Sequence, residues 1–134
     1  MVKDIEAAKE YLSGKTVYIV GASIGASLAM KYAAQDASVR KIILLSPGNE
    51  YKGVNIEQDN MIYEGGVLMV ASEDDAYSAD SSKKLAEKGR GAAKLQMYET
   101  AGHGTNMLAA QPELVGFLID WLNSPTDRHL VFFL

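Results

Sequence analysis

The sequence predicts an α/β protein with about four parallel strands and flanking helices. Along its 134 residues, strand-like apolar runs alternate with segments of helical spacing, which is the order of elements in a parallel sheet. Two of the runs, Ile42-Ile43-Leu44-Leu45 and Val67 to Ala71, are continuously apolar, as strands buried on both faces are. A chain of this length forms one core. We therefore expect a single domain over residues 1–124 and an apolar C-terminal tail over residues 125–134.

The N-terminal half is expected to hold a helix, a strand, a second helix and a second strand. Apolar residues at helical intervals define the first helix, which Ser13-Gly14 ends: Ile5, Ala8 and Leu12. Thr16 to Val20 is the first strand. An apolar stripe marks the second helix: Ile24, Leu28, Tyr32 and Ala33. The second strand, Lys41 to Ser46, ends at Pro47-Gly48-Asn49.

The C-terminal half is expected to add two strands and three helices. The polar stretch from Glu50 to Gly66 has room for only a short helix, near Val54 to Ile62. Val67 to Ala71 is the third strand, a helix runs from about Ser78 to Lys88, and Lys94 to Tyr98 is the fourth strand. The last helix has Pro112 in its first turn and one wide apolar face, which we assign to the core: Leu114, Phe117, Leu118, Trp121 and Leu122.

Composition excludes several classes of function. The net charge is −4, the sequence pI is about 5.1 and the lysines are scattered, so we expect no nucleic acid and no anionic membrane as partner. The chain contains no cysteine, which excludes disulfides, thiolate zinc sites and cysteine nucleophiles. The segment Met1 to Glu6 is too charged for a secretory leader, and no apolar run has transmembrane length. A cytoplasmic protein is the expectation.

Between the first strand and the second helix lies Gly21-Ala22-Ser23-Ile24-Gly25, a GxSxG segment. A strand, GxSxG and a helix in this order are typical of a nucleophile elbow. Gly21 and Gly25 have no Cβ to collide where the strand folds back against the helix, so Ser23 can hold a strained conformation at the apex. A serine hydroxyl attacks only when a base reaches it. Taken alone, Ser23 could equally cap the helix.

Two further loops carry chemistry that would suit such a serine. In a parallel sheet, functional residues gather beyond the carboxyl ends of the strands. Glu73, Asp74 and Asp75 follow the third strand, and His103, between two glycines, follows the fourth. The chain order serine, acid, histidine is that of one fold family. Singly, an aspartate before a helix is more often a cap and a histidine in a glycine loop is often only exposed. The combination favours catalysis.

Together these segments resemble the α/β-hydrolase superfamily, especially its dienelactone-hydrolase-like and small esterase members. The resemblance covers Met1 to Ser124 and rests on the elbow and three other segments: Leu45-Ser46-Pro47-Gly48, Ala71 to Tyr77, and Ala101-Gly102-His103-Gly104. It implies the C-terminal half of that fold, without the N-terminal strands. It also implies Asp75 as the triad acid, because that acid precedes a small residue and an aromatic one in the family, here Ala76-Tyr77. Asp74 is the second choice.

The function implied is a carboxylesterase-type serine hydrolase that cleaves short-chain esters through an acyl-enzyme intermediate on Ser23. His103 would act as base and then acid, Asp75 would orient it, and the backbone amide of Ile24 would donate to the oxyanion. No metal and no cofactor is required. Short acyl chains are favoured because the connection Asn49 to Gly66 is brief.

The alternative is a catalytically weak or inactive hydrolase-like fragment that serves as a binding or assembly module. It is favoured by one absence, since no HGG-type segment supplies a second oxyanion donor. A dinucleotide-binding interpretation of the same glycines is disfavoured. A further glycine would be expected at Ser27, and the sole YxxxK, Tyr11 to Lys15, precedes the glycine segment instead of following it.

Besides a small-molecule ester substrate, the expected partner is a second copy of the chain. Without the N-terminal strands, the strand Thr16 to Val20 would lie at an open edge of the sheet with unpaired backbone groups. The tail segment Leu130 to Leu134 is apolar and strand-prone. We expect a homodimer that covers the edge, the tail or both, with the tail folding back on its own sheet as the alternative. His129 has no assigned role.

Overall fold

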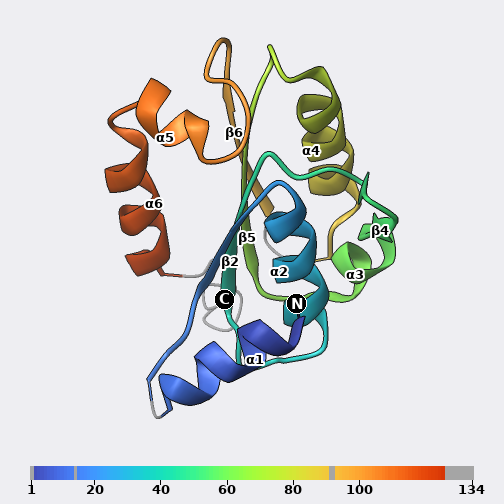
Figure 1. Cartoon of the computed structure of the whole chain (residues 1–134), viewed down its shortest axis with the longest axis vertical. Helices are drawn as coiled ribbons and strands as arrows, with labels where there is room; N and C mark the ends of the chain where they lie inside the picture. Colours follow the sequence, from blue (N-terminus) through green and yellow to red (C-terminus); the bar gives the residue numbers. More distant parts are fainter. Residues whose placement is uncertain (1, 14, 91–92, 126–134) are drawn as a thin grey trace, which may run out of the picture.

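A parallel sheet forms the middle of three layers in the computed structural model, which describes residues 2–13, 15–90 and 93–125 (Figure 1). The strands of this sheet are β1 (Ile19–Ala22), β2 (Lys41–Leu45), β5 (Gly66–Ser72) and β6 (Ala93–Tyr98). The other elements are helices and one small hairpin: α1 (Val2–Tyr11), α2 (Ile24–Ala34), β3 (Glu50–Tyr51), β4 (Val54–Asn55), α3 (Glu57–Ile62), α4 (Ala76–Lys88), α5 (Asn106–Ala110) and α6 (Leu114–Asn123).

The sheet has the strand order β1-β2-β5-β6, and every pair in it is parallel. Every residue of the central strands β2 and β5 is buried. Each fully buried Ile or Leu contributes roughly 1.5–3 kcal/mol relative to an exposed one, so these two strands anchor the core. The predicted fold class, about four parallel strands with flanking helices, is confirmed.

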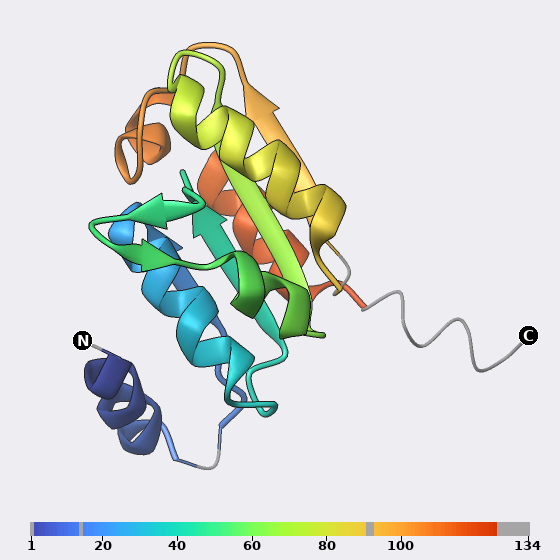
Figure 2. The same ribbon diagram turned by 90° about the vertical axis from the view of Figure 1, so that its right-hand side faces the viewer.

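Helices cover both faces of this sheet, with α2, α3 and α4 on one side and α5 and α6 on the other (Figures 1 and 2). The alternation along β2 divides its side chains between the two layers. Ile42 and Leu44 join the cluster beneath α2 and α4, whereas Ile43 and Leu45 join the cluster beneath α5 and α6. Helix α1 buries none of its residues and lies at the end of the molecule beside α2.

Strand β1 begins later than the sequence predicts. It spans Ile19–Ala22 in place of Thr16 to Val20. Pairing decides the difference, because its register with β2 starts at Ile19 opposite Ile42, one residue after β2 begins. Among the described residues, β1 pairs with β2 alone and therefore forms one edge of the sheet. Val20 is 50% exposed at this edge.

The apolar stripe of α2 differs from the predicted one. Tyr32 and Ala33 are buried as expected, but Ile24 and Leu28 are only half-buried. Besides Met30, the rest of the buried face is made of small residues: Ala26, Ser27 and Ala29. Alanine side chains let the helix approach the sheet closely, which a stripe defined by large residues overlooks. Trp121 is likewise half-buried and packs at the border of the core.

Two short elements were missed in the sequence. The β3–β4 hairpin turns at Lys52 and Gly53, whose φ angles are 49° and 81°. Two positive φ angles in succession are the pattern of the turn that suits a tight hairpin, so Gly53 was the available signal. Helix α5 precedes α6, and Pro112 lies in the turn between them, before α6 begins at Leu114.

A buried lysine caps the C-terminus of α6. The Lys41 ammonium donates to the carbonyl oxygens of Trp121, Leu122 and Ser124 at 2.8, 3.1 and 2.5 Å. The last carbonyls of a helix lack regular intrahelical donors, and here the Trp121 carbonyl also accepts the Ser124 amide at 3.2 Å. Its Nζ also lies 5.0 Å from the centre of the Trp121 ring. Burial lowers the pKa of Lys41. The three carbonyl oxygens replace the water molecules that would otherwise solvate its ammonium group.

The predicted tail extends from residue 125 to residue 134, and only Pro125 of it lies within the described residues. The predictions for His129 and for Leu130 to Leu134 therefore lie outside the part of the chain that the structure describes. Within residues 2–13, 15–90 and 93–125, none of the helices has the length and apolar character needed to cross a membrane.

Candidate active site

Ser23 stands at a sharp turn between β1 and α2. Its φ and ψ angles are 55° and −121°, a region that costs a residue with a side chain about 1–3 kcal/mol. The turn is held by the Ser23 amide, which donates to the carbonyl of Leu45 at 2.9 Å. A Cβ on Gly21 would lie 2.2 Å from the carbonyl oxygen of Gly25. Glycine at position 21 is therefore required for the helix to start so close to the strand.

Gly25 does not play the steric role expected of it. Apart from its chain neighbours and the nearby backbone of its own helix, a Cβ built on Gly25 would have no described atom within 4 Å, so it would not collide with the strand. The close approach comes from the Gly25 backbone, which lies against Gly21. One glycine at the crossing point is sufficient, because only one of the two residues directs its Cβ toward the other segment.

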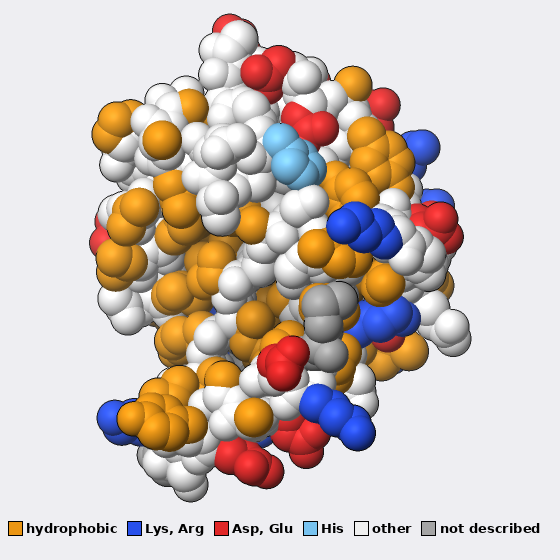
Figure 3. Space-filling model, viewed as in Figure 1, with side chains coloured by type: hydrophobic (Ala, Val, Ile, Leu, Met, Phe, Trp, Pro, Cys, Tyr) orange, Lys and Arg blue, Asp and Glu red, His pale blue; other side chains and the backbone are white. Residues whose placement is uncertain are grey.

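His103 reaches Ser23 from the loop after β6. Its Nε2 lies 2.9 Å from Ser23 Oγ, and its side chain is 43% exposed. The two glycines beside it, Gly102 and Gly104, have φ angles of 81° and 62°. Side chains other than glycine seldom adopt this region, which explains why the loop has the sequence Gly-His-Gly. A histidine is visible at the surface in Figure 3.

Asp75 completes a chain of three side chains. Its Oδ2 lies 2.5 Å from His103 Nδ1. Ser23 and Asp75 both occupy N-cap positions, of α2 and α4, yet neither side chain forms a capping hydrogen bond. Both point to His103 instead. An imidazole held between a hydroxyl and a carboxylate can accept the hydroxyl proton while the carboxylate fixes its tautomer.

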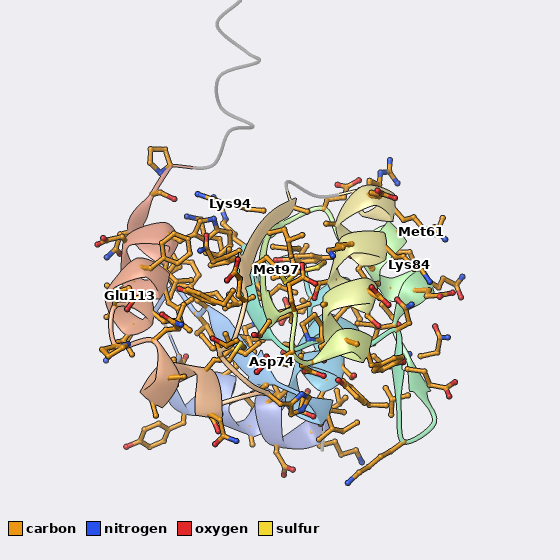
Figure 4. The ribbon with its side chains drawn as sticks, turned by 90° about the horizontal axis from the view of Figure 1, so that it is seen from above. Met61, Asp74, Lys84, Lys94, Met97 and Glu113 are labelled. Carbon is orange, nitrogen blue, oxygen red and sulfur yellow. The ribbon has the colours of Figure 1, made fainter. Side chains whose placement is uncertain are left out.

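The neighbouring acids have other partners. Asp74 Oδ1 accepts hydrogen bonds from the Ser72 hydroxyl at 2.5 Å and from the Gly102 amide at 3.1 Å. The Ser72 bond, and then the Gly102 amide, hold the pKa of Asp74 below its ordinary value. Figure 4 labels Asp74 between α4 and α5. Glu73 pairs with Lys83 at 3.1 Å on the exposed surface. Asp74, the second choice for the acid, thus holds the histidine loop.

Two serines that the sequence analysis did not single out hold the same loop from both sides. Ser72 Oγ accepts the Ala101 amide at 2.7 Å, and Ser46 Oγ accepts the Gly104 amide at 2.7 Å. Both serines are fully buried, and Ser46 has a left-handed φ of 52°. The signal for both was a serine at the end of a continuously apolar strand, where a buried hydroxyl needs a partner.

The β3–β4 hairpin brings Tyr51 to the histidine. The rings of Tyr51 and His103 meet edge to face, with centroids 6.2 Å apart, and burial raises the pKa of Tyr51. Helix α4 anchors this segment, since the Tyr51 and Ser78 hydroxyls lie 2.6 Å apart and Ser81 Oγ accepts the Asn49 amide at 3.2 Å.

The amide of Ile24 opens α2. The first N–H groups of a helix have no intrahelical acceptor, and the helix dipole adds partial positive charge at this end. Here the Ala26 and Ser27 amides donate to the Ser23 carbonyl at 2.9 and 3.4 Å. The Ile24 amide, immediately after Ser23, is thus one of the N–H groups at the positive end of α2.

Neither a metal centre nor the other described pocket involves Ser23. Within the described residues, no group of three or more histidine, aspartate or glutamate side chains is arranged to hold a metal ion. A pocket of about 350 Å³ lies at the opposite end of the sheet, where its lining includes Lys15 and Arg40 from the segments before β1 and β2. It takes no part in the Ser23–His103–Asp75 arrangement.

Comparison with known proteins identifies the fold. A family model described as the alpha/beta hydrolase fold matches residues 1–65. No curated protein sequence matches the chain. The chain is similar to the esterase domain of a Rhodothermus marinus protein, with a TM-score of 0.71 and 16% identity over 88% of this chain and 67% of that one.

Two more solved structures are similar to the chain in fold. Dienelactone hydrolase from Anabaena variabilis gives a TM-score of 0.71 and 14% identity over 89% of this chain and 58% of that one. A predicted CIB-like hydrolase from Thermoplasma acidophilum gives a TM-score of 0.74 and 22% identity over 90% of this chain and 57% of that one. The chain therefore spans 57% to 67% of the length of these three proteins.

Proposed function

The chain has the alpha/beta hydrolase fold, and from this premise we propose that it is a serine hydrolase that cleaves short-chain carboxylic esters through an acyl-Ser23 intermediate. The observation that carries the proposal is the position of the His103 ring, with Nε2 2.9 Å from Ser23 Oγ and Nδ1 2.5 Å from Asp75 Oδ2. Serine, imidazole and carboxylate in this order are the groups of a Ser-His-Asp triad, which carries out acyl transfer.

In the proposed first step, Ser23 Oγ bonds to the carbonyl carbon while its proton moves to His103 Nε2. The carbon–oxygen bond to the alcohol then breaks, and Nε2 returns the proton to the leaving oxygen. In the second step, water attacks the acyl-Ser23 carbon in the same way and releases the carboxylic acid. Asp75 keeps the proton of the imidazole on Nδ1 and stabilises the imidazolium. No redox change or co-reactant other than water is needed.

Charge on the carbonyl oxygen would be stabilised by the Ile24 amide at the N-terminus of α2. One such donor is worth about two to three powers of ten in rate in a serine hydrolase. The strained φ of 55° at Ser23 supports this role, because it turns the side chain out of the strand while the following amide starts the helix.

A short acyl group is supported by the connection from β2 to β5. This connection forms the small β3–β4 hairpin and the six-residue helix α3, and His103 is 43% exposed. An ester therefore meets Ser23 near the surface. We expect a higher kcat/KM for p-nitrophenyl acetate than for p-nitrophenyl decanoate, and the reverse order would contradict the short-chain assignment.

The deciding experiment is intact mass spectrometry after treatment with a fluorophosphonate. The parent should gain one phosphonyl group, and Ser23→Ala and His103→Ala should gain none, because the first lacks the nucleophile and the second lacks its base. Circular dichroism of the three proteins checks that they are folded. An unlabelled but folded parent would overturn the proposal in favour of the non-catalytic binding or assembly module.

We also propose that the ester-cleaving form is a homodimer that covers the edge at β1. Among the described residues β1 has one neighbouring strand, and Tyr18 and Val20 are 38% and 50% exposed there. Unpaired backbone groups and apolar side chains at an edge favour pairing with another strand. Light scattering at micromolar concentration should give about twice the chain mass of 14.5 kDa, and Val20→Lys should lower it. A monomeric parent would refute this arrangement.

A further inference from the structure

One tyrosine ring packs against His103 and a second packs against the first, and the proposed steps leave both without a role. Tyr51 contacts the His103 ring edge to face, with centroids 6.2 Å apart and planes at 85°. Tyr77 contacts Tyr51 in the same way at 5.5 Å and 72°. Hydrophobic side chains are visible next to the histidine at the surface (Figure 3). We name Tyr51 and Tyr77 together the tyrosine wall.

Hydrogen bonds and a close glycine hold both rings of the tyrosine wall. The Tyr51 hydroxyl lies 2.6 Å from Ser78 Oγ. The Tyr77 hydroxyl donates to the Glu50 carbonyl at 2.7 Å and accepts the Glu50 amide at 3.0 Å. Gly48 lets the rings pack together, because a Cβ there would lie 2.6 and 2.7 Å from them. Glycine at position 48 and the three hydroxyl bonds thus hold both rings in one orientation.

The chemical character of this surface follows from those bonds. Both hydroxyls are already engaged by the protein, so the rings offer carbon atoms and π faces to a ligand. Tyr77 is 48% exposed, which leaves the wall accessible. Aromatic pairs prefer edge-to-face or offset packing, and the wall already has this geometry. A flat aromatic ring of a ligand could pack against the tyrosine wall in the same edge-to-face or offset geometry.

The position of the wall selects one side of the ester. His103 Nε2 gives its proton to the leaving oxygen, so that oxygen must lie within hydrogen-bond reach of the imidazole. The group attached to the oxygen then begins beside the ring that Tyr51 contacts. We propose that the tyrosine wall binds the alcohol part of the substrate and favours esters of aromatic alcohols. This inference rests on the proposed function and adds the alcohol class to it.

The test compares benzyl acetate with cyclohexylmethyl acetate. Their alcohols have nearly equal acidity and size, and both esters form the same acetyl-Ser23, so a difference in kcat/KM comes from recognition of the ring. The parent should prefer benzyl acetate by about two- to tenfold, as expected for one aromatic contact. Tyr51→Leu should bring the ratio to about one, and Tyr51→Phe should retain the preference because it keeps the ring.

A second measurement needs no variant. Benzyl alcohol should inhibit hydrolysis of p-nitrophenyl acetate by the parent at several-fold lower concentration than cyclohexylmethanol. Equal inhibition together with equal kcat/KM for the two esters would overturn the aromatic alcohol site while the serine hydrolase assignment stands. A Tyr51→Leu variant that loses activity on both esters to the same extent would likewise show that Tyr51 only supports the hairpin. A parent that is not labelled by fluorophosphonate overturns both proposals.

Discussion

Ser46 and Gly104 are joined by a buried hydrogen bond of 2.7 Å, in which the Gly104 amide donates to Ser46 Oγ. This bond connects the end of β2 to the loop that carries His103. Ser46 also donates its amide to the Val70 carbonyl at 2.7 Å, which ties the same point to β5. The histidine loop is therefore fixed to the two central strands, and its position follows the most deeply buried part of the core.

Ser46→Ala should lower both stability and activity. It leaves the buried Gly104 amide without an acceptor, which costs about 1–3 kcal/mol in the free energy of unfolding. It also loosens the loop, so kcat on p-nitrophenyl acetate should fall with little change in KM. Urea unfolding and steady-state kinetics measure the two effects.

The matched control for Ser46→Ala is Ser82→Ala. Ser82 is equally buried, but its hydroxyl has no hydrogen-bond partner among the described residues. Removing an unsatisfied hydroxyl should leave stability unchanged or raise it slightly. An equal loss of stability in both variants would show that the bond to Gly104 is not the cause.

Asp75→Asn and Asp74→Asn should separate the two adjacent acids. The first replaces the carboxylate on His103 Nδ1 and should lower kcat by about three to four powers of ten, because the amide favours the wrong tautomer. The second keeps an oxygen for the Gly102 amide and should lower kcat by less than about tenfold. Steady-state kinetics on one ester decide between them, and the opposite ranking would transfer the catalytic role to Asp74.

Gly21→Ala and Gly25→Ala should differ sharply in stability. The added methyl group at position 21 would lie 2.2 Å from a backbone oxygen, whereas at position 25 it meets no described atom outside its own helical turn within 4 Å. Gly21→Ala should therefore abolish folding or destabilise the protein by several kcal/mol. Gly25→Ala should be neutral or stabilise by up to about 1 kcal/mol, since alanine is the better helix former. Thermal unfolding of both variants would disprove this if their midpoints were similar.

The pH dependence of stability should show the contribution of Asp36. Its carboxylate accepts bonds from Lys9 at 2.5 Å, Ser38 at 2.7 Å and Tyr32 at 2.7 Å, and these hold the pKa of Asp36 well below its usual range. Because the pKa of Asp36 is lower in the folded than in the unfolded state, its ionised form stabilises the fold at pH values above the unfolded pKa of about 3.9. This stabilisation is lost as the pH falls below that value.

Asp36→Asn should accordingly destabilise the protein at pH 7 and have a much smaller effect near pH 2. The same carboxylate raises the pKa of Tyr32 to about 12, so the parent should also lose stability as the pH rises above about 10. Tyr32→Phe removes that alkaline loss. Thermal unfolding midpoints from pH 2 to 11 test both effects, and parallel curves for the parent and Asp36→Asn would contradict the assignment.

Much of this fold is legible in the sequence because its central strands are buried on both faces. In a chain of this size, a continuous apolar run such as Ile42 to Leu45 is stable mainly as a strand in the middle of the sheet. The structure has β2 at this position, with every residue buried. The edge strand β1 was harder to place. Its ends depend on which residues face β2, and the residues before Ile19 have no partner strand among those described.

Part of the candidate site could be predicted from the sequence for a different reason. Gly-x-Ser and Gly-His-Gly are local patterns set by backbone angles that only certain residues adopt, as the φ angles of Ser23, Gly102 and Gly104 show. For the supporting serines the local signal is only a serine at the end of an apolar strand, which does not identify the hydrogen-bond partner. The hydrogen-bond partners of Ser72 and Ser46 lie 29 and 58 positions away, and Tyr51 acts through a ring contact with His103. No local signal identifies partners that are so distant in the sequence.

By itself, the sequence determined the fold class and the three loops that could carry chemistry, because periodicity and glycine conformations are local properties. Only the tertiary structure decided which acid meets the imidazole. Asp74 and Asp75 are adjacent and chemically identical, so the choice depends on the relative position of β5 and the loop after β6. There, Asp75 reaches His103 Nδ1 and Asp74 reaches the Gly102 amide. Distances between distant segments follow from packing the whole core.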